Sequence, residues 1–468
     1  MDPLTAGVLL VGHGSELSAD SSSPVRELAR RLRGAHAAGE VHVAFWKEEP
    51  YLHHALDLFE SRDVFVVPLF TSEGYFTEGV LPRELGMDPP CLRPWMCVRR
   101  CPPVGTHPAM ADLVLARARE AVRLSTGAER DAALVVLGHG TETHPGSGAT
   151  TRAVVEALRR RAIYRDVVSA FLDQSPGIAG VLGGLDAPDR IVVPFFIGEG
   201  WHVGTTIPEE LGLGETRTTL GEATVWYSKP VGTHPGILEV VRAIFSEAVA
   251  GVGEAYTRAG LGPADPPARV ARETFLQGLR GGGAGPRTFL QVGITASDDD
   301  RFELRHREDL HRPSPELATY ADANAAEGLG GRTAAGEHRP LRTAPGLARG
   351  WRIAGLDGEG VWEALGQLYP GAAIHRELAG RGELAVTPFW ETATRQTGIY
   401  AGLEGLPEGE IETAVRDRCG DRCLRTPFWE PASAYVRPER AGSVPCPEAC
   451  PALLSRVRKG RPAASSEG

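Results

Sequence analysis

The chain has 468 residues, a hydrophobic fraction of 42% and a formal net charge of −10 at pH 7. This length predicts roughly two to four domains, and the acidic balance argues against nucleic acid as a partner. The N-terminus lacks the features of a secretion signal and no apolar run is long enough to span a membrane, so we expect a cytoplasmic protein without a membrane partner. The seven cysteines are then expected as thiols, metal ligands or redox groups rather than as disulfides.

Residues 1–250 contain the same pattern twice. The tripeptide Gly-His-Gly at 12–14 recurs at 138–140, an offset of 126 residues. After one further residue of slippage, Gly-Thr-His-Pro at 105–108 recurs at 232–235. An internal repeat of this length indicates a duplicated domain.

Both copies are expected to alternate strands and helices. Nearly continuous apolar runs are typical of strands buried on both faces of a parallel sheet. These runs are residues 7–11, 63–70, 132–137 and 190–197. Apolar positions in helical phase predict a helix at 24–32 and its counterpart near 154–158. The expected fold class is therefore α/β, with two tandem-duplicated lobes at 1–125 and 130–250, each built on a parallel sheet.

The rest of the chain is divided by composition into four further segments. Glycine and proline are frequent between the second lobe and residue 287, which predicts a linker at 251–287. Residues 288–400 are expected to form an additional domain whose fold the pattern does not identify. Residues 401–458 carry four cysteines, and the polar residues 459–468 are predicted to be a disordered tail. Together these segments are expected to be an α+β extension.

Some elements of the extension can be predicted individually. Residues 288–294 are expected to form a strand, with 302–307 as its partner, and 358–368 are expected to be helical. The pentapeptide Thr-Pro-Phe-Trp-Glu occurs at 387–391 and again at 426–430, which suggests a small structural module used twice.

A candidate site arises from residues that follow buried strands. His13 and His139 each stand between two glycines directly after a strand, and the loop after the next strand in the second copy contains Glu199 and His202. Residues beyond the carboxyl ends of strands line the ligand crevice of open α/β domains. The first copy has Phe76 where the second has His202. We therefore expect His139, His202 and Glu199 to form one site in the second lobe.

These histidines also have a structural interpretation, in which they cap strands or bond to a carbonyl group. A single histidine would favour that interpretation, whereas a His-His-Glu group at matching positions of a duplicated domain favours function. His107 and His234, in the two Gly-Thr-His-Pro motifs, are interpreted as structural turns.

Residues 5–240 resemble the class II tetrapyrrole chelatases, in particular the sirohydrochlorin cobaltochelatase type. The similarity lies in Gly138-His139-Gly140, in Gly200-Trp201-His202 followed by Ile207-Pro208, and in Gly232-Thr233-His234-Pro235. The resemblance implies two lobes around a cleft for the macrocycle, with the pair His139 and His202 handling the metal. It also implies a lyase that inserts Co²⁺ into sirohydrochlorin for cobalamin biosynthesis, with a ferrochelatase for siroheme or a nickel chelatase as the nearest alternative.

The chemistry of metal insertion suits these residue types. Two pyrrole N–H protons leave the tetrapyrrole as the metal enters, and a neutral imidazole, with a pKa of about 6.5, can accept a proton or bind a first-row ion. Glu199 could supply a third ligand or remove a proton. Many two-lobed members of the family keep the histidine pair in the first lobe, whereas Phe76 breaks that pair here, so we expect the second lobe to act. The alternative from another functional class is a non-enzymatic tetrapyrrole or metal carrier with a redox-sensing cluster. The chain is also a candidate for assembly into a homo-oligomer.

Four of the seven cysteines form two pairs near the end of the chain. Cys419 and Cys423 make one pair, Cys446 and Cys450 make the other, and 22 residues separate the pairs. Four thiolates suit a 4Fe–4S cluster or structural zinc, and the three-residue gap within each pair favours the cluster over zinc or unliganded thiols. Some chelatases of the type that this chain resembles carry an iron–sulfur site in such an extension. The remaining three cysteines, in the first lobe, are interpreted as ordinary buried thiols rather than redox or metal groups: Cys91, Cys97 and Cys101.

Overall fold

The computed structural model of the chain contains two compact units. The first comprises Met1–Trp46 with Tyr51–Pro266, and the second comprises Lys47–Pro50 with Pro267–Gly468. The structure describes residues 1–15, 21–87, 95–122, 128–141, 145–200, 202–213, 217–252, 270–281, 286–297, 300–331, 333, 346–380, 387–394, 396, 402–403, 405–419, 442–444, 449 and 451–460. None of the helices in these ranges combines the length and the apolar character needed to cross a bilayer.

The first repeat forms a parallel sheet of four strands in the order β2-β1-β3-β4. Its strands and helices are β1 (Gly7–Gly12), α1 (Ser23–Gly34), β2 (Glu40–Phe45), α2 (Leu52–Ala55), β3 (Asp63–Pro68), the π-helical turn η4 (Phe76–Val80), α3 (Leu81–Glu84), β4 (Cys97–Arg100) and α4 (Met110–Ala121). All six residues of β1 are buried, as expected for a central strand covered on both faces. The predicted apolar face of α1 is confirmed, because Val25, Leu28 and Leu32 are buried.

The second repeat has the same strand order with one added antiparallel edge strand, giving β6-β5-β7-β9-β8. Its elements are β5 (Ala133–Gly138), α5 (Ala149–Arg159), β6 (Asp166–Phe171), α6 (Ile178–Gly183), β7 (Asp189–Pro194), the π-helical turn η8 (His202–Thr206), α7 (Ile207–Glu210), β8 (Arg217–Leu220), β9 (Ala223–Tyr227) and α8 (Ile237–Ala250). The predicted α/β fold with two tandem lobes on parallel sheets is thus confirmed.

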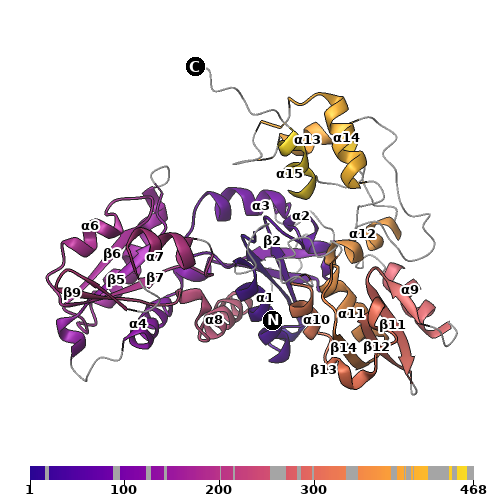
Figure 1. Cartoon of the computed structure of the whole chain (residues 1–468), viewed down its shortest axis with the longest axis horizontal. Coiled ribbons are helices and arrows are strands. Elements are labelled where there is room, and N and C mark those ends of the chain that lie inside the picture. Colours follow the sequence, from indigo (N-terminus) through magenta and orange to yellow (C-terminus); the bar gives the residue numbers. More distant parts are fainter. Residues whose placement is uncertain are drawn as a thin grey trace. The chain divides into compact units, whose positions relative to one another are not determined.

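The two lobes exchange their last helices. Helix α4 ends the first repeat but packs on β7 and α5 of the second, whereas α8 ends the second repeat and packs on β3 and α1 of the first (Figure 1). The rings of Phe65 on β3 and Phe245 on α8 meet edge to face, with centroids 5.5 Å apart. One apolar core therefore contains buried side chains of both repeats. The exchange makes the two lobes a single packed body.

The second unit contains a five-stranded sheet in the order β10-β11-β12-β14-β13. Its elements are α9 (Val270–Gly281), β10 (Arg287–Phe289), β11 (Val292–Ser297), β12 (Arg301–His306), β13 (Ala318–Tyr320), α10 (Ala325–Leu329), β14 (Trp351–Leu356), α11 (Gly358–Leu368) and α12 (Pro370–Gly380). Helix α9 lies inside the predicted linker and packs against α11 and α12, with Phe275 buried in their common core. The predicted helix at 358–368 is confirmed by α11.

One strand prediction in this unit is wrong. Residues 288–294 do not form a single strand, because the chain turns back between β10 and β11, which pair as an antiparallel hairpin. The turn contains Leu290 in the left-handed region, at φ 54°, a conformation that a leucine rarely adopts and that its sequence does not signal. The expected partner strand is confirmed, since β12 pairs with β11.

The last described part of the extension has a small apolar core of its own. It is formed by β15 (Thr387–Pro388), α13 (Phe389–Ala393), α14 (Glu408–Cys419), β16 (Ser443–Val444) and α15 (Pro451–Gly460). The first Thr-Pro-Phe-Trp-Glu motif supplies β15 and the start of α13, whereas its second occurrence lies outside the described residues. Of the predicted disordered tail, Lys459 and Gly460 belong to α15, and residues 461–468 also lie outside the described residues.

Candidate active site

The candidate site of the second lobe lies where the strand order changes direction. From β5 the chain runs outward to β6 on one side, and then crosses back to β7 on the other side. The carboxyl ends of β5 and β7 therefore flank a topological switch point, the usual ligand position in open α/β sheets. His139 directly follows β5, and the loop after β7 carries Glu199 and leads to η8, which begins at His202. We call His139, Asp173, Phe196 and the start of η8 the switch-point site.

His139 has a defined tautomer and a carboxylate neighbour. Its Nδ1 lies 2.9 Å from the carbonyl oxygen of Gly140 and 3.4 Å from Oδ2 of Asp173. Because both oxygens accept hydrogen bonds, Nδ1 carries the hydrogen and the neutral ring keeps its acceptor lone pair on Nε2. The ring is 52% exposed and lies against Phe196, with ring centroids 6.2 Å apart. This imidazole is therefore oriented to accept a proton or bind a metal through Nε2.

Asp173 was not predicted from the sequence, although a signal for it exists. It occupies the loop after β6, and the residue 126 positions earlier is Lys47. A carboxylate beside Nδ1 of a histidine holds the ring in place and stabilises its protonated form, whereas a cation would not. The charge reversal between the copies thus distinguishes the second lobe at the same place as the exchange of Phe76 for His202.

The structure places only the backbone of His202, as the first residue of η8; its side chain lies outside the described residues. The first lobe shows what the duplicated geometry brings together, because the rings of His13 and Phe76 have centroids 6.3 Å apart. Phe76 also stacks on Phe70, at 4.6 Å. In the first lobe, then, the residue that starts the π-helical turn is a neighbour of the motif histidine.

Each π-helical turn is tied to the neighbouring strand by a side chain. In the first lobe a guanidinium nitrogen of Arg100 donates to the carbonyl oxygen of Thr77, at 2.6 Å. At the equivalent place in the second lobe the hydroxyl of Tyr227 donates to the carbonyl oxygen of Val203, at 3.0 Å. Burial raises the pKa of Tyr227, so its hydroxyl keeps the donated hydrogen. The two side chains differ in chemistry and hold the same turn.

The Gly-Thr-His-Pro motifs support the loops that lead into these turns. The N–H of Gly232 donates to the carbonyl oxygen of Phe196, at 2.9 Å, and a Cβ at position 232 would lie 2.3 Å from Cα of Ile197. Gly105 donates in the same way to Phe70 and touches the backbone of Thr71 equally closely. Only glycine permits this approach, so both glycines fix the path of the chain after β3 and β7.

The histidines of these motifs bond to their own turns and to carboxylates of the exchanged helices. Nδ1 of His234 accepts from the N–H of Gly236, at 3.0 Å, and its Nε2 lies 3.4 Å from a carboxylate oxygen of Glu120 on the exchanged helix α4. Burial lowers the pKa of His234, and the nearby Glu120 opposes that shift. His107 mirrors this arrangement, with Nε2 3.7 Å from Glu247 on α8. Each motif histidine thus contacts a carboxylate of an exchanged helix.

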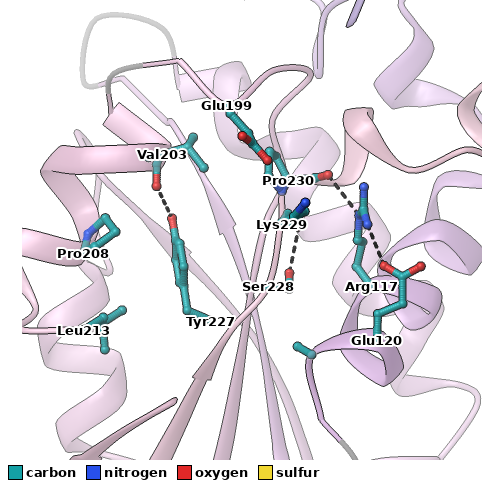
Figure 2. Close-up of a pocket in the computed structure, with 12 residues that line it drawn as sticks. Arg117, Glu120, Glu199, Val203, Pro208, Leu213, Tyr227, Ser228, Lys229 and Pro230 are labelled. Atoms are coloured by element: carbon teal, nitrogen blue, oxygen red, sulfur yellow. Dashed lines mark hydrogen bonds and ion pairs between the residues drawn. The ribbon is translucent and has the colours of Figure 1, made fainter. Parts of the chain in front are cut away.

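A pocket of about 620 Å³ lies beside η8, at the carboxyl end of β9 (Figure 2). We call it the flanking pocket. Its polar and charged wall consists of Arg117, Glu120, Glu199, Tyr227, Ser228 and Lys229. Glu199 therefore belongs to the wall of this pocket, and within the described residues no hydrogen bond or ion pair joins it to His139.

No three His, Cys, Asp or Glu side chains of the described residues are arranged to hold a metal ion. The side chain of His202 is outside that set. The side chain of Cys419, at the end of α14, is also outside it, as are Cys423, Cys446 and Cys450. In the first lobe Cys97 and Cys101 are buried, as expected for ordinary thiols, and burial raises the pKa of Cys101 to about 12. Cys91 lies outside the described residues.

Known protein families match both lobes and two segments of the extension. Residues 7–121 and 133–248 each match the family described as CbiX. Residues 277–380 match a family described as the DR2241 stabilising domain, and residues 381–459 match a 4Fe-4S iron-sulfur cluster binding domain. The last match includes all four paired cysteines.

Two individual proteins are similar over long stretches. A probable sirohydrochlorin cobaltochelatase of Halobacterium salinarum is 36% identical over 276 residues, which make up 53% of this chain and 93% of that protein. The crystal structure of DR2241 from Deinococcus radiodurans is 29% identical with a TM-score of 0.77, over 97% of this chain and 98% of that chain. DR2241 is described as a multi-domain protein with structural similarity to chelatases and with two additional novel domains.

Proposed function

Because the chain belongs to the CbiX family of chelatases, we propose that it inserts a divalent metal ion, with Co²⁺ as the preferred substrate, into sirohydrochlorin. The observation that best supports this proposal is the geometry of His139. Its Nδ1–H is held by Gly140 and Asp173 at a strand end beside the switch point, which leaves Nε2 as the acceptor of the neutral ring.

Each residue of the site has a part in the proposed reaction. His139 and His202 bind the incoming ion and accept the pyrrole protons that it displaces, and Asp173 holds His139 and stabilises its protonated ring. Glu199, three residues before His202, passes a proton to solvent or serves as a further ligand to the incoming ion. Two imidazoles and a carboxylate bind an ion less tightly than a closed four-thiolate site, so the metal can be released to the macrocycle.

The proposed activity is tested with metal-free sirohydrochlorin and Co²⁺, Fe²⁺ or Ni²⁺ in separate anaerobic assays, followed by the absorbance of the macrocycle. We expect many turnovers with Co²⁺, and slower insertion of the other two ions. Faster insertion of Fe²⁺ or Ni²⁺ would reassign the metal, because nitrogen and oxygen donors alone do not set the preference. Stoichiometric binding without turnover would identify a carrier instead of an enzyme.

The extension is proposed to hold a 4Fe–4S cluster through Cys419, Cys423, Cys446 and Cys450. Four thiols are the donor set that this cluster requires. Cys419 ends α14, the segment 446–450 lies between β16 and α15, and these elements share one small core. When bound, the cluster would supply an electron-transfer group, and metal insertion involves no net electron transfer.

Protein purified without oxygen should therefore be brown and contain about four iron and four sulfide ions per chain. Cys446→Ala should lose the iron yet retain metal insertion, because the residues assigned to insertion all lie in the second lobe. Cys97→Ala, which removes a buried thiol of the first lobe, is the matched control and should keep the iron. A colourless sample with stoichiometric zinc would disprove the cluster, and a folded but inactive Cys446→Ala would show that insertion depends on it.

A further inference from the structure

Three residues that line the flanking pocket differ between the two repeats. Gly204, Tyr227 and Lys229 line the pocket, and the equivalent residues of the first repeat are Glu78, Arg100 and Pro102. There Arg100 pairs with Glu78 at 2.8 Å, and also ties down the π-helical turn. These two side chains therefore bond to each other at positions whose counterparts line the pocket in the second lobe.

The second lobe keeps a hydrogen bond that holds the π-helical turn, but it lacks the ion pair found in the first lobe. Tyr227 holds Val203, whereas a glycine at 204 removes the partner carboxylate and opens the space beside η8. Lys229 has no charged counterpart in the first repeat, because the equivalent residue there is a proline. Its cation therefore appears only in the repeat that has the complete histidine pair.

The two cations of the pocket, Arg117 and Lys229, differ in whether they are already bonded. Arg117 is buried, and two of its nitrogens donate to the carbonyl oxygen of Pro230 at 3.1 Å and to Glu120 at 2.6 Å (Figure 2). The third nitrogen donates to the hydroxyl of Thr233 at 2.7 Å. Lys229 is exposed, and in the described part of the chain no carboxylate lies within 4.0 Å of its amine. One cation thus remains available to a ligand.

The position of Lys229 along the chain is rigid although its side chain is long. Ser228 is bonded to Val192 of β7 through its N–H at 3.0 Å, and its hydroxyl donates to the carbonyl oxygen of Lys229 at 2.9 Å. Three of the 50 basic residues are lysines, so Lys229 departs from the arginine that this chain uses almost everywhere. A compact ammonium on a flexible stem can follow an anion whose own arm is flexible.

We propose that the flanking pocket receives a carboxylate-bearing edge of the tetrapyrrole and that Lys229 supplies its counter-charge; the inference rests on the proposed function. β5 and β9 are two strand spacings apart, about 10 Å, and their carboxyl ends lie at the same edge of the sheet as His139. That separation places Lys229 toward the rim of a macrocycle whose centre lies at His139. Glu199, on the same wall, disfavours a second carboxylate and so favours one orientation of the ring.

The test compares Lys229→Met with Lys229→Arg in the full-length protein. For Lys229→Met, the KM for sirohydrochlorin and the Kd of the metal-free macrocycle should both rise about fivefold, as expected when an exposed charge pair is lost. The kcat should not change, because the lysine contacts the rim and not the reacting centre. Lys229→Arg should restore the KM, and the difference between wild type and Lys229→Met should shrink at high salt.

Two controls separate this effect from a general loss of charge. Arg242→Met removes an exposed cation of α8 that pairs with Glu239 at 3.3 Å, and it should leave the KM unchanged. Sirohydrochlorin with methyl-esterified carboxylates should bind wild type and Lys229→Met equally. An unchanged KM for Lys229→Met, or an equal loss with the esterified substrate, would overturn the inference while wild-type turnover leaves the proposed function intact. Absence of insertion by the wild type would instead reject the proposed function.

Discussion

Replacing His202 by phenylalanine is expected to lower the rate of metal insertion roughly 10²–10⁴-fold, the range typical for loss of a proton acceptor at the reacting centre. The substitution copies the first repeat into the second, because Phe76 occupies the equivalent position. Phenylalanine can pack at this place, as Phe76 does against Phe70, but it can neither accept a proton nor bind a first-row ion. Steady-state insertion rates measure the loss, and thermal melts check that the variant is folded.

The matched control is His13→Ala in the first lobe. His13 bonds to the carbonyl oxygen of Gly14 at 2.9 Å, as His139 does to Gly140, so the two histidines share their local geometry. A lone imidazole binds an ion weakly, and we therefore expect His13→Ala to cost far less activity than His202→Phe. If His13→Ala were the more damaging change, the reaction would belong to the first lobe.

Gly232→Ala is expected to lower insertion about 100-fold, the cost of a misplacement of about 1 Å at a reacting group. The added Cβ would lie 2.3 Å from Cα of Ile197, and because backbone cannot move aside as a flexible side chain does, the loop that carries Glu199 must shift. Overpacking of this kind also destabilises the fold by about 1–3 kcal/mol. Insertion rates and denaturant melts measure the two effects separately.

Gly105→Ala provides the comparison, since its Cβ would lie 2.1 Å from the carbonyl oxygen of Thr71 in the first lobe. We expect a similar loss of stability and much less loss of activity, because that loop leads to Phe76. Equal losses of activity would mean that both loops serve the reaction, or that stability alone limits it.

The parts of the fold that depend on local pattern could be predicted from the sequence. Continuous apolar runs identified the buried strands, and the buried face of α1 follows from its 3.6-residue period. The exchange of α4 and α8 could not be predicted, because an amphipathic helix satisfies its pattern on either sheet. The hairpin at Leu290 was missed since its turn contains no turn-forming residue at that position.

The candidate site was predictable to the extent that the two copies could be compared. Gly-His-Gly turns and the difference at positions 76 and 202 are visible in the repeat. Asp173 and Lys229 are visible there too, but only after the structure shows that one lies beside His139 and the other lines a pocket. The role of Tyr227 could not be recognised from the repeat, because the equivalent residue of the first copy is Arg100. The two side chains differ in chemistry, yet both donate a hydrogen bond to the π-helical turn.

The exchanged helices also bear on how the two lobes came to differ. A single repeat alone would leave a face of its sheet without the helix that covers it, so two unlinked copies would be complete only as an intertwined homodimer. In such a dimer every position is the same in both subunits, and Phe76 could not coexist with His202. Fusion into one chain removed that constraint. It allowed the first half to carry Phe76 while the second half kept both motif histidines, His139 and His202.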